Sequence, residues 1–327
     1  MPCHKKSFEF RVSSSESKGQ AAPRSPLSFE FRVSSSELEE RAKSLSPLDW
    51  KLETGNSKLR KSRGFTLVEM IMVVAITGII AAVVAVFIRR PVESYVDVAR
   101  RGELSDIADT ALRRITRDVR SALPNSIRIT TAGNVTYLEY LQTSGGGRYR
   151  AAPDSAGAGN VLDFVAADVS FDVIGTMPAL AAGNSIVVYN LSPTGSTANA
   201  YSGDNRAAYS SNTATTITLS AAKLFPFQSP AKRFQVVEDA VTYACDPLPS
   251  GAGVLRRHSN YGIVNPQPAP PAGGSNALLA TNITGCSFTY TASGATARTG
   301  ILALDLQISE GGETIRLFQQ AHVNNVP

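Results

Sequence analysis

One stretch decides the fold of this chain, and it reads KSRGFTLVEMIMVVAITGIIAAVVAVFI at residues 61–88. After Gly64, the 24 positions from 65 to 88 contain a single charged residue, Glu69. A helix rises about 1.5 Å per residue, so these positions cover roughly 36 Å, slightly more than the hydrocarbon core of a bilayer. An ordinary secretory signal has an apolar core of about 7 to 15 residues and a small-residue cleavage site beyond it, and neither is present. The sequence therefore predicts a transmembrane helix over residues 65–91.

Residues 1–64 differ in composition from the rest of the chain. They hold 13 Lys or Arg against 8 Asp or Glu, whereas residues 65–327 hold 19 of each, so the net charge of +5 lies entirely before Phe65. The segment lacks the apolar surface that would offset its ordering entropy, and we predict a disordered basic leader. Because the remaining body is electrically balanced, it offers no general footprint for phosphate, and no nucleic-acid partner is expected.

The leader also contains a perfect duplication, SFEFRVSSSE, at residues 7–16 and 28–37. It leaves two interpretations open: a long translated leader, or a start codon further along, so that part of the segment is never translated. Four positive charges at residues 58–63 favour a cytoplasmic N-terminus with export of the rest of the chain. Arg89 and Arg90 beyond the span weaken this asymmetry.

Residues 92–124 repeat apolar side chains at intervals of three and four, which predicts an amphipathic helix. The apolar stripe consists of Val96, Leu104, Ile107, Ala108, Ala111, Leu112, Ile115, Val119 and Leu123. The other face mixes arginines with carboxylates, which is typical of a solvated helix rather than a nucleic-acid surface. Pro91 predicts a kink between span and stripe, although the two halves remain able to form one nearly continuous helix. Pro124 and Asn125 are expected to end the helix.

Residues 125–327 change to a period of two, with β-branched residues and turns of Gly, Pro, Asn and Ser, which predicts strands. The expected strands are 126–130, 135–141, 161–165, 169–174, 185–191, 215–219, 234–237, 240–245, 254–258, 286–291, 302–309 and 314–319. The last two flank a hairpin signal at residues 310–313. Two polar stretches, 192–212 and 266–275, are expected to be surface loops. The predicted fold class is α+β, with the stripe of the long helix covering the apolar face of an antiparallel sheet.

The residues around Gly64 carry a family resemblance. Residues 61–69 combine a basic flank, Gly64, the aromatic Phe65, Thr66 and a carboxylate, Glu69, at the fifth position after the glycine, directly joined to the apolar run. In this order they resemble the type IV prepilin family. The resemblance implies that a membrane prepilin peptidase cuts between Gly64 and Phe65, and that Phe65 is then N-methylated. A glycine suits such a cut, because without a Cβ its backbone can lie extended and close in a protease cleft.

The resemblance also implies a role for Glu69 in assembly. A carboxylate at mid-bilayer costs roughly 2.5 to 3.5 kcal/mol and normally needs a partner. Cleavage would create an amine at Phe65 with a usual pKa of about 8, and methylation leaves its positive charge in place. In the family, this amine pairs with the fifth-residue carboxylate of a neighbouring subunit. The alternative is that Glu69 is an interfacial residue favoured near a helix N-terminus.

The cysteines fit an exported domain. Cys3 lies in the leader, which leaves Cys245 and Cys286 as an even pair in an oxidising compartment. A disulfide between them would close a loop of about 42 residues, worth roughly 4 kcal/mol in the chain-entropy model. Two buried thiols are the alternative.

Candidate catalytic or cofactor sites find little support in the sequence. The three histidines, His4, His258 and His322, lack metal-ligand spacing. The glycines at residues 145–147 are expected to form a flexible turn, and the carboxylates at 238–239 to point to opposite faces of a strand. Asp305, Glu310 and Glu313 around the last hairpin are expected to be solvated turn charges rather than a cation site. We expect no enzyme activity, no cofactor and no metal.

The function implied by the resemblance is that of a minor pilin or pseudopilin in a type IV pilus system. Its head would lie in the periplasm, anchored by one pass in the bacterial inner membrane before entry into a filament. The implied partners are the prepilin peptidase, other minor and major pilins, and the inner-membrane assembly platform. Later stretches, including residues 108–115 and 320–327, resemble minor pilins of mannose-sensitive haemagglutinin (MSHA) systems. The alternatives are a J-class pseudopilin of type II secretion, a membrane-anchored adhesin or enzyme, and an uncleaved signal anchor.

Overall fold

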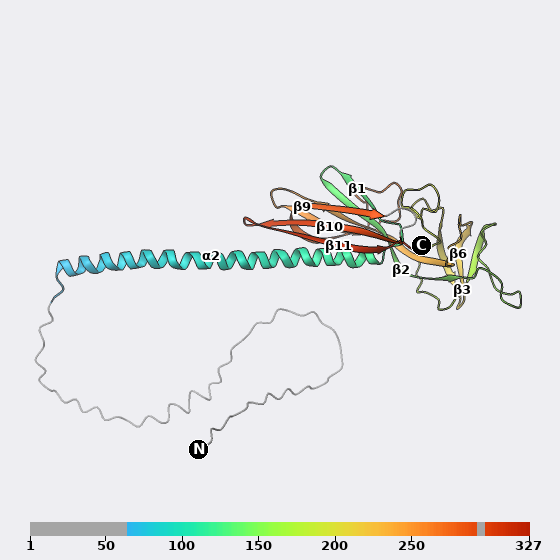
Figure 1. Ribbon diagram of the computed structural model, residues 1–327, viewed down its shortest axis with the longest axis horizontal. Coiled ribbons are helices and arrows are strands. Elements are labelled where there is room, and N and C mark those ends of the chain that lie inside the picture. Colours follow the sequence, from blue (N-terminus) through green and yellow to red (C-terminus); the bar gives the residue numbers. More distant parts are fainter. Residues whose placement is uncertain (1–63, 293–297) are drawn as a thin grey trace, which may run out of the picture. The chain divides into compact units, whose positions relative to one another are not determined.

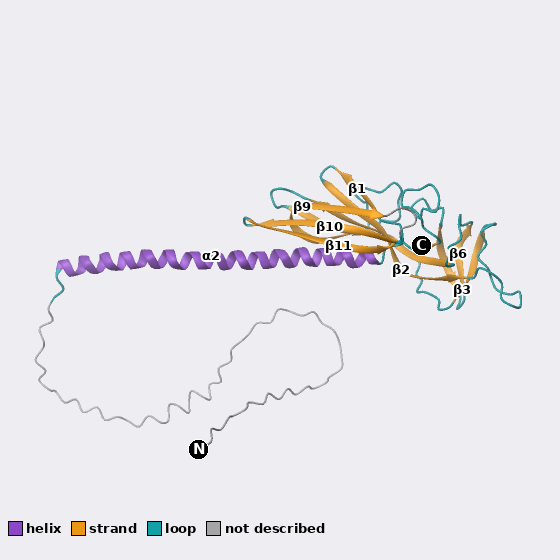
Figure 2. Cartoon of the chain, in the orientation of Figure 1, coloured by secondary structure: helices purple, strands orange, loops and turns teal. Residues whose placement is uncertain are grey.

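A computed structural model describes residues 64–292 and 298–327 of the chain (Figures 1 and 2). The predicted leader, with Cys3 and His4, lies outside the described residues. The chain divides into two compact units, residues 1–69 and 70–327.

The long helix α2 (Leu67–Arg120) contains 54 residues and includes Pro91. Of the two arrangements that the sequence left open at Pro91, the structure has the continuous helix. The helix ends at Arg120, four residues before the predicted end at 124. The cause is pairing with the sheet: Ala122 forms a β-bridge with Gln142, and the Leu123 amide donates to the Leu141 carbonyl at 2.8 Å.

The described strands form an antiparallel sheet, which follows the helix in the chain. Its strands are β1 (Arg128–Ala132), β2 (Val135–Tyr149), β3 (Asp168–Ile174), β4 (Ser185–Val187), β5 (Arg206–Asn212), β6 (Thr216–Lys223), β7 (Arg233–Asp246), β8 (Gly253–Ser259), β9 (Ser275–Ala292), β10 (Thr299–Glu310) and β11 (Glu313–Asn324). Their order is β1-β2-β3-β6-β5-β4-β7-β8-β9-β10-β11, with a further pairing of β2 to β7. The coarse expectation of one long helix followed by an antiparallel sheet is confirmed, and most of the head is sheet.

The predicted stripe of α2 is buried from Leu104 onward. Leu104, Leu112, Ile115 and Val119 are at most 1% exposed and share a core with the inward face of β10. That face carries Leu302, Leu304, Leu306 and Ile308, which alternate as predicted and are all buried. The buried part of the stripe starts later than expected: Val96, its first predicted residue, is 44% exposed.

A second core lies under β3, β5 and β6 and is rich in aromatic side chains. Phe171 and Phe234 meet there edge to face, with ring centroids 5.4 Å apart. Aromatic pairs prefer this geometry because the positive ring edge faces the negative ring face. A third, smaller cluster includes Leu123, Leu141 and Val237, so the head has three apolar clusters, and the first holds the stripe of α2 from Leu104 to Val119.

A disulfide and a buried ion pair each join two strands of the head. A disulfide joins Cys245 on β7 to Cys286 on β9, as the sequence predicts. Arg128 on β1 and Glu139 on β2 form a buried ion pair at 2.6 Å, and the guanidinium of Arg128 lies 3.6 Å above the ring of Tyr201. Burial raises the pKa of Glu139, and the neighbouring Arg128 opposes that shift.

Several expected strands and loops were wrong, and the contacts or backbone conformation of each segment account for the difference. Residues 161–165 are irregular and bend at 164–165 rather than forming a strand, because the Asp163 carboxylate accepts a hydrogen bond from the Val165 amide at 2.7 Å. The expected strand 185–191 stops at Val187, and Tyr189 then adopts a left-handed φ of 54°. The expected loop 192–212 contains β5, which pairs with β4 and β6.

Two further segments differ from the expectation because each belongs to a longer strand that is paired with a neighbouring strand. The expected turn at residues 145–147 is a continuation of β2, paired with β7. The expected strand 286–291 is the second half of β9, whose first half pairs with β8. In both cases the strand extends through residues of low intrinsic strand preference, because hydrogen bonding to a neighbour outweighs that preference.

The packing of α2 on the sheet predicts unequal effects of the same substitution in its two halves. Ile115→Ala should lower the free energy of unfolding by about 2–5 kcal/mol, because it leaves a cavity between helix and sheet. Ile79→Ala is the matched control on the same helix, since Ile79 is 66% exposed, and it should change the stability of the head little. Denaturant unfolding of the full-length chain in detergent, followed by the near-UV circular dichroism of its tyrosines, measures both. Equal losses would contradict this packing.

Candidate processing and assembly segment

The proposed cleavage point lies in accessible backbone. Gly64, Phe65 and Thr66 precede the helix, have no regular secondary structure and are exposed, with Phe65 at 76%. The bond between Gly64 and Phe65 is therefore outside the hydrogen-bonded helix. Proteolysis concentrates where the backbone is exposed and free of such bonds, so this arrangement suits a protease.

Thr66 caps the helix, a role that the sequence reasoning missed. The Glu69 amide donates to Thr66 Oγ1 at 3.2 Å and to the Thr66 carbonyl at 3.1 Å. The signal was present as Thr-x-x-Glu at positions 66–69, which is the spacing of a capping box. The cap places the exposed carboxylate of Glu69 in the first turn, where the helix dipole favours negative charge.

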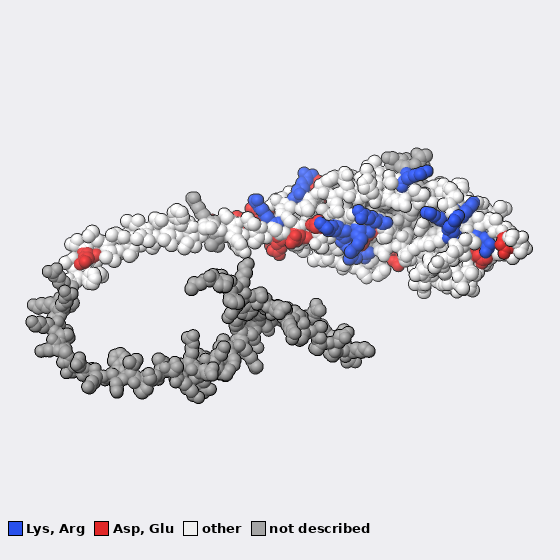
Figure 3. Space-filling model, turned by 60° about the horizontal axis from the view of Figure 1, so that its bottom comes forward, with Lys and Arg blue, Asp and Glu red and all other residues white. Residues whose placement is uncertain are grey.

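The part of α2 before the head is apolar and exposed. Its large side chains, such as Ile79 at 66% and Phe87 at 75%, have no covering among the described residues. Figure 3 shows this part of the helix as an almost entirely white surface, whereas charged side chains gather on the head. Within the described residues, α2 is the one helix long and apolar enough to cross a membrane.

Small residues follow one side of this apolar part. Ala75, Gly78, Ala82 and Ala85 are spaced by three, four and three positions, which places them on one helix face. An ideal Cβ built on Gly78 meets no heavy atom within 4 Å. Small residues let a second helix approach closely within an apolar phase.

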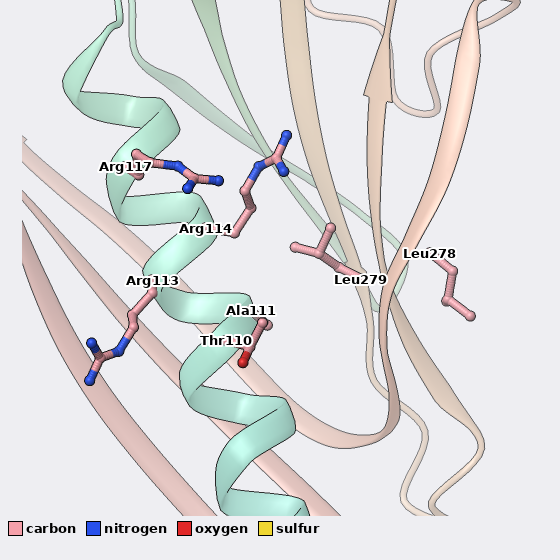
Figure 4. Close-up of a pocket in the computed structure, with 7 residues that line it drawn as sticks. All are labelled: Thr110, Ala111, Arg113, Arg114, Arg117, Leu278 and Leu279. Carbon is pink, nitrogen blue, oxygen red and sulfur yellow. The ribbon is translucent and has the colours of Figure 1, made fainter. Parts of the chain in front are cut away.

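A groove of about 470 Å³ lies beside α2, where the helix meets β9 (Figure 4). Its lining consists of Thr110, Ala111, Arg113, Arg114, Arg117, Leu278 and Leu279. Figure 4 shows Arg114 and Arg117 reaching toward the strands, Arg113 pointing to the other side of the helix, and Leu279 lying between helix and sheet. The groove is therefore apolar at its floor and cationic along the helix.

Asp118 forms ion pairs with arginines of the helix and of the sheet at the end of this groove. It forms ion pairs at 3.1 Å with Arg114 on its own helix and with Arg257 on β8. It also accepts a hydrogen bond of 2.7 Å from the Tyr243 hydroxyl. Burial and this hydrogen bond raise the pKa of Tyr243, so the tyrosine stays a neutral donor. Helix and sheet are thus joined by polar contacts at Asp118 as well as by the apolar stripe.

The remaining candidate residues do not converge on a reactive centre. In the described part of the chain, no group of three His, Cys, Asp or Glu side chains lies close enough to hold a metal ion. Asp305 pairs with Arg316, and Glu313 pairs with Arg101 at 2.6 Å. The carboxylate of Glu310 accepts a hydrogen bond from Asn282 at 3.0 Å. The hairpin carboxylates are therefore engaged in contacts with other side chains.

Comparison with known proteins adds one match. Residues 59–85 match the family model described as the prokaryotic N-terminal methylation motif. The matched stretch contains Gly64, Phe65 and Glu69. No curated protein and no solved structure gives a significant match to the chain. The match supports a type IV pilin-like or pseudopilin-like protein, and the motif implies processing by a prepilin peptidase and membership of a pilus-type system. Together with the apolar helix it suggests membrane anchoring.

The contacts of Asp118 predict that it stabilises the head more than other acids of the helix do. Asp118→Asn should lower the free energy of unfolding by about 1–3 kcal/mol, because it weakens two ion pairs and one hydrogen bond that lie partly buried. Asp109→Asn is the matched control, since its pair with Arg113 is exposed, and it should cost about 0.5 kcal/mol or less. Thermal unfolding of the full-length chain in detergent compares the two. A larger loss for Asp109→Asn would show that Asp118 does not join helix and sheet.

Proposed function

We propose that this chain is a minor pilin or pseudopilin that is cut between Gly64 and Phe65, methylated on Phe65 and built into a type IV pilus-like filament. The observation that carries the proposal is the methylation motif at 59–85, continuous with an apolar helix whose side chains are exposed. Such a helix needs an apolar surrounding, which the bilayer supplies before assembly and neighbouring helices supply afterwards.

Glu69 would fix the axial position of the subunit in the filament. The amine that cleavage creates on Phe65 is mostly cationic at neutral pH. Glu69 presents an exposed carboxylate one turn further along. In an apolar bundle, neither charge is stable alone, so a subunit gains most when its acid meets the amine of a neighbour. This pairing selects one helix register among many that the apolar surface alone would allow.

A role as a low-copy subunit fits the size of the head. Residues 92–327 form a bulky domain, which would crowd a densely packed helical fibre and is better tolerated at a tip or priming position. Stretches such as residues 89–95, 108–115, 245–257 and 320–327 resemble MshO, a minor pilin of MSHA systems. We propose accordingly that the chain acts with other minor and major pilins and the inner-membrane assembly platform to start a filament of this kind.

The proposed topology is a single pass through the bacterial inner membrane with the head in the periplasm. The disulfide between Cys245 and Cys286 supports an oxidising compartment for the head. A J-class pseudopilin of type II secretion would share motif and layout, and neighbouring pilus-assembly or secretion genes would distinguish the two. We propose no catalytic role and no cofactor.

Mass spectrometry of the mature N-terminus tests the processing step. The protein isolated from cells with the prepilin peptidase should begin with N-methylated Phe65, and residues before it should be absent. Gly64→Val should leave the leader attached, because its side chain prevents the close approach of the backbone to the protease cleft that glycine allows. Gly102→Val is the control, since Gly102 lies in the exposed part of α2 far from the cut. An unmodified N-terminus before Gly64 in the wild type would overturn the proposal.

Substitution of Glu69 tests the assembly step. Glu69→Val should still be inserted and cleaved, but its incorporation into sheared filaments should fall by at least about tenfold, because the amine of a neighbour loses its charge partner. Glu103→Gln removes an exposed carboxylate from the same helix and should assemble normally. Quantitative immunoblots of filament and membrane fractions measure both. Normal incorporation of Glu69→Val would show that Glu69 is only an interfacial residue.

A further inference from the structure

Two arginines face each other across neighbouring strands of the head. Arg148 on β2 is the direct partner of Arg233 on β7, and both side chains are exposed. The adjacent pair is hydrogen-bonded, since the Tyr149 amide donates to the Lys232 carbonyl at 2.9 Å. Pairs alternate along an antiparallel ladder, so Arg148 and Arg233 occupy a non-hydrogen-bonded pair, in which side chains lie closest. Like charges directly opposite one another destabilise a sheet.

No acid in the described structure is paired with either of these two arginines, in contrast to arginines elsewhere, on the helix and in the sheet. Arg113 pairs with Asp109 and Arg128 with Glu139, both at 2.6 Å. Among the described residues, the side chains of Arg148 and Arg233 form no ion pair and no hydrogen bond. The protein thus keeps two neighbouring positive charges that its own acidic residues do not neutralise.

A hollow of about 300 Å³ lies at the arginine pair. It is lined by Gly146, Gly147, Arg148, Arg233, Phe234 and Gln235. A Cβ on Gly146 would lie 2.7 Å from the Phe234 carbonyl oxygen and 2.6 Å from the Gln235 side-chain oxygen, so no larger residue fits without movement. Residue 146 shares a face with residue 148, so this glycine lets Gln235 lie close to the backbone beside Arg148.

The chemistry of the hollow favours a carboxylate. Two planar guanidinium groups offer donors in forks that match the two oxygens of a carboxylate, and the Gln235 amide adds a neutral hydrogen-bonding group. The hollow is the size of a side chain rather than of a polymer. Residues 65–327 also carry 19 basic and 19 acidic residues, so no extended positive field would hold a nucleic acid there.

We propose that Arg148 and Arg233 form a docking site for a carboxylate presented by an acidic segment of another protein. The site lies at the junction of β2 and β7, backed by the aromatic core under β3. A bound carboxylate would relieve the repulsion between the two guanidinium groups. Binding would therefore also stabilise the pairing of β2 with β7 at Arg148 and Arg233. The proposal is independent of processing and filament assembly.

Binding of a fluorescein-labelled hexaglutamate peptide to the full-length chain in neutral-lipid nanodiscs tests the site. Arg148→Gln/Arg233→Gln should weaken binding by at least about tenfold, because it removes both charge-assisted contacts. Arg113→Gln/Arg117→Gln is the matched control, since it removes the same charge from exposed arginines that have acidic neighbours. Arg148→Lys/Arg233→Lys keeps the charge but loses the forks, and should bind with intermediate strength.

Thermal unfolding distinguishes a docking site from a structural role. Without peptide, the Arg148→Gln/Arg233→Gln variant should be as stable as the wild type or more stable, because it removes a like-charge pair. A wild type that does not bind the peptide, or equal binding by the wild type and this variant, would overturn the proposal. Loss of binding only in the Arg113→Gln/Arg117→Gln control would also overturn it. Displacement of the peptide by inorganic phosphate at lower concentrations than by glutarate would reassign the site to phosphate groups and overturn the carboxylate assignment.

Discussion

Burial of one face of α2 against the sheet is the interaction on which the rest of the described structure depends. From Leu104 to Val119 the apolar stripe of the helix is covered by β10 and its neighbours. The same helix continues toward Phe65 with large apolar side chains that no described residue covers. A helix that is apolar all round is stable only in an apolar surrounding. The covered half therefore holds the head, and the uncovered half requires a bilayer or other helices.

Charged side chains differ in their contacts between the covered and the uncovered half of the helix. Asp118 joins the helix to the sheet through Arg257 and Tyr243. The buried pair of Arg128 and Glu139 joins β1 to β2 in the head. Glu69, by contrast, lies in the first turn of α2 at the start of the apolar half, where its carboxylate is exposed and the helix dipole favours negative charge. Asp118 and the pair of Arg128 and Glu139 thus stabilise the head, whereas the exposed carboxylate of Glu69 is the residue to which the proposed function assigns a role in assembly.

Much of the architecture could be predicted from local patterns. The apolar run is continuous, the stripe of α2 and the last hairpin each repeat with a clear period, and all three are present. The predictions failed where the partner of a segment lies far away in the chain. The glycines at 145–147 indicated a turn, yet β7, about ninety positions later, pairs with them and extends β2. The contacts of Asp118 with Arg257 were equally invisible, because 139 positions separate the two residues. The Thr66 cap, a local signal, could have been found.

The central claim is that residues 65–88 lie in the bilayer while the head is exported. Single cysteines introduced by Ala82→Cys in the apolar half and Thr213→Cys on the exposed surface of the head test it most directly. The background carries Cys3→Ser, and the cells cannot assemble filaments. We predict that a membrane-impermeant maleimide labels Thr213→Cys in spheroplasts, whereas it labels Ala82→Cys only after detergent solubilisation. Equal labelling of both cysteines in intact spheroplasts would contradict the account.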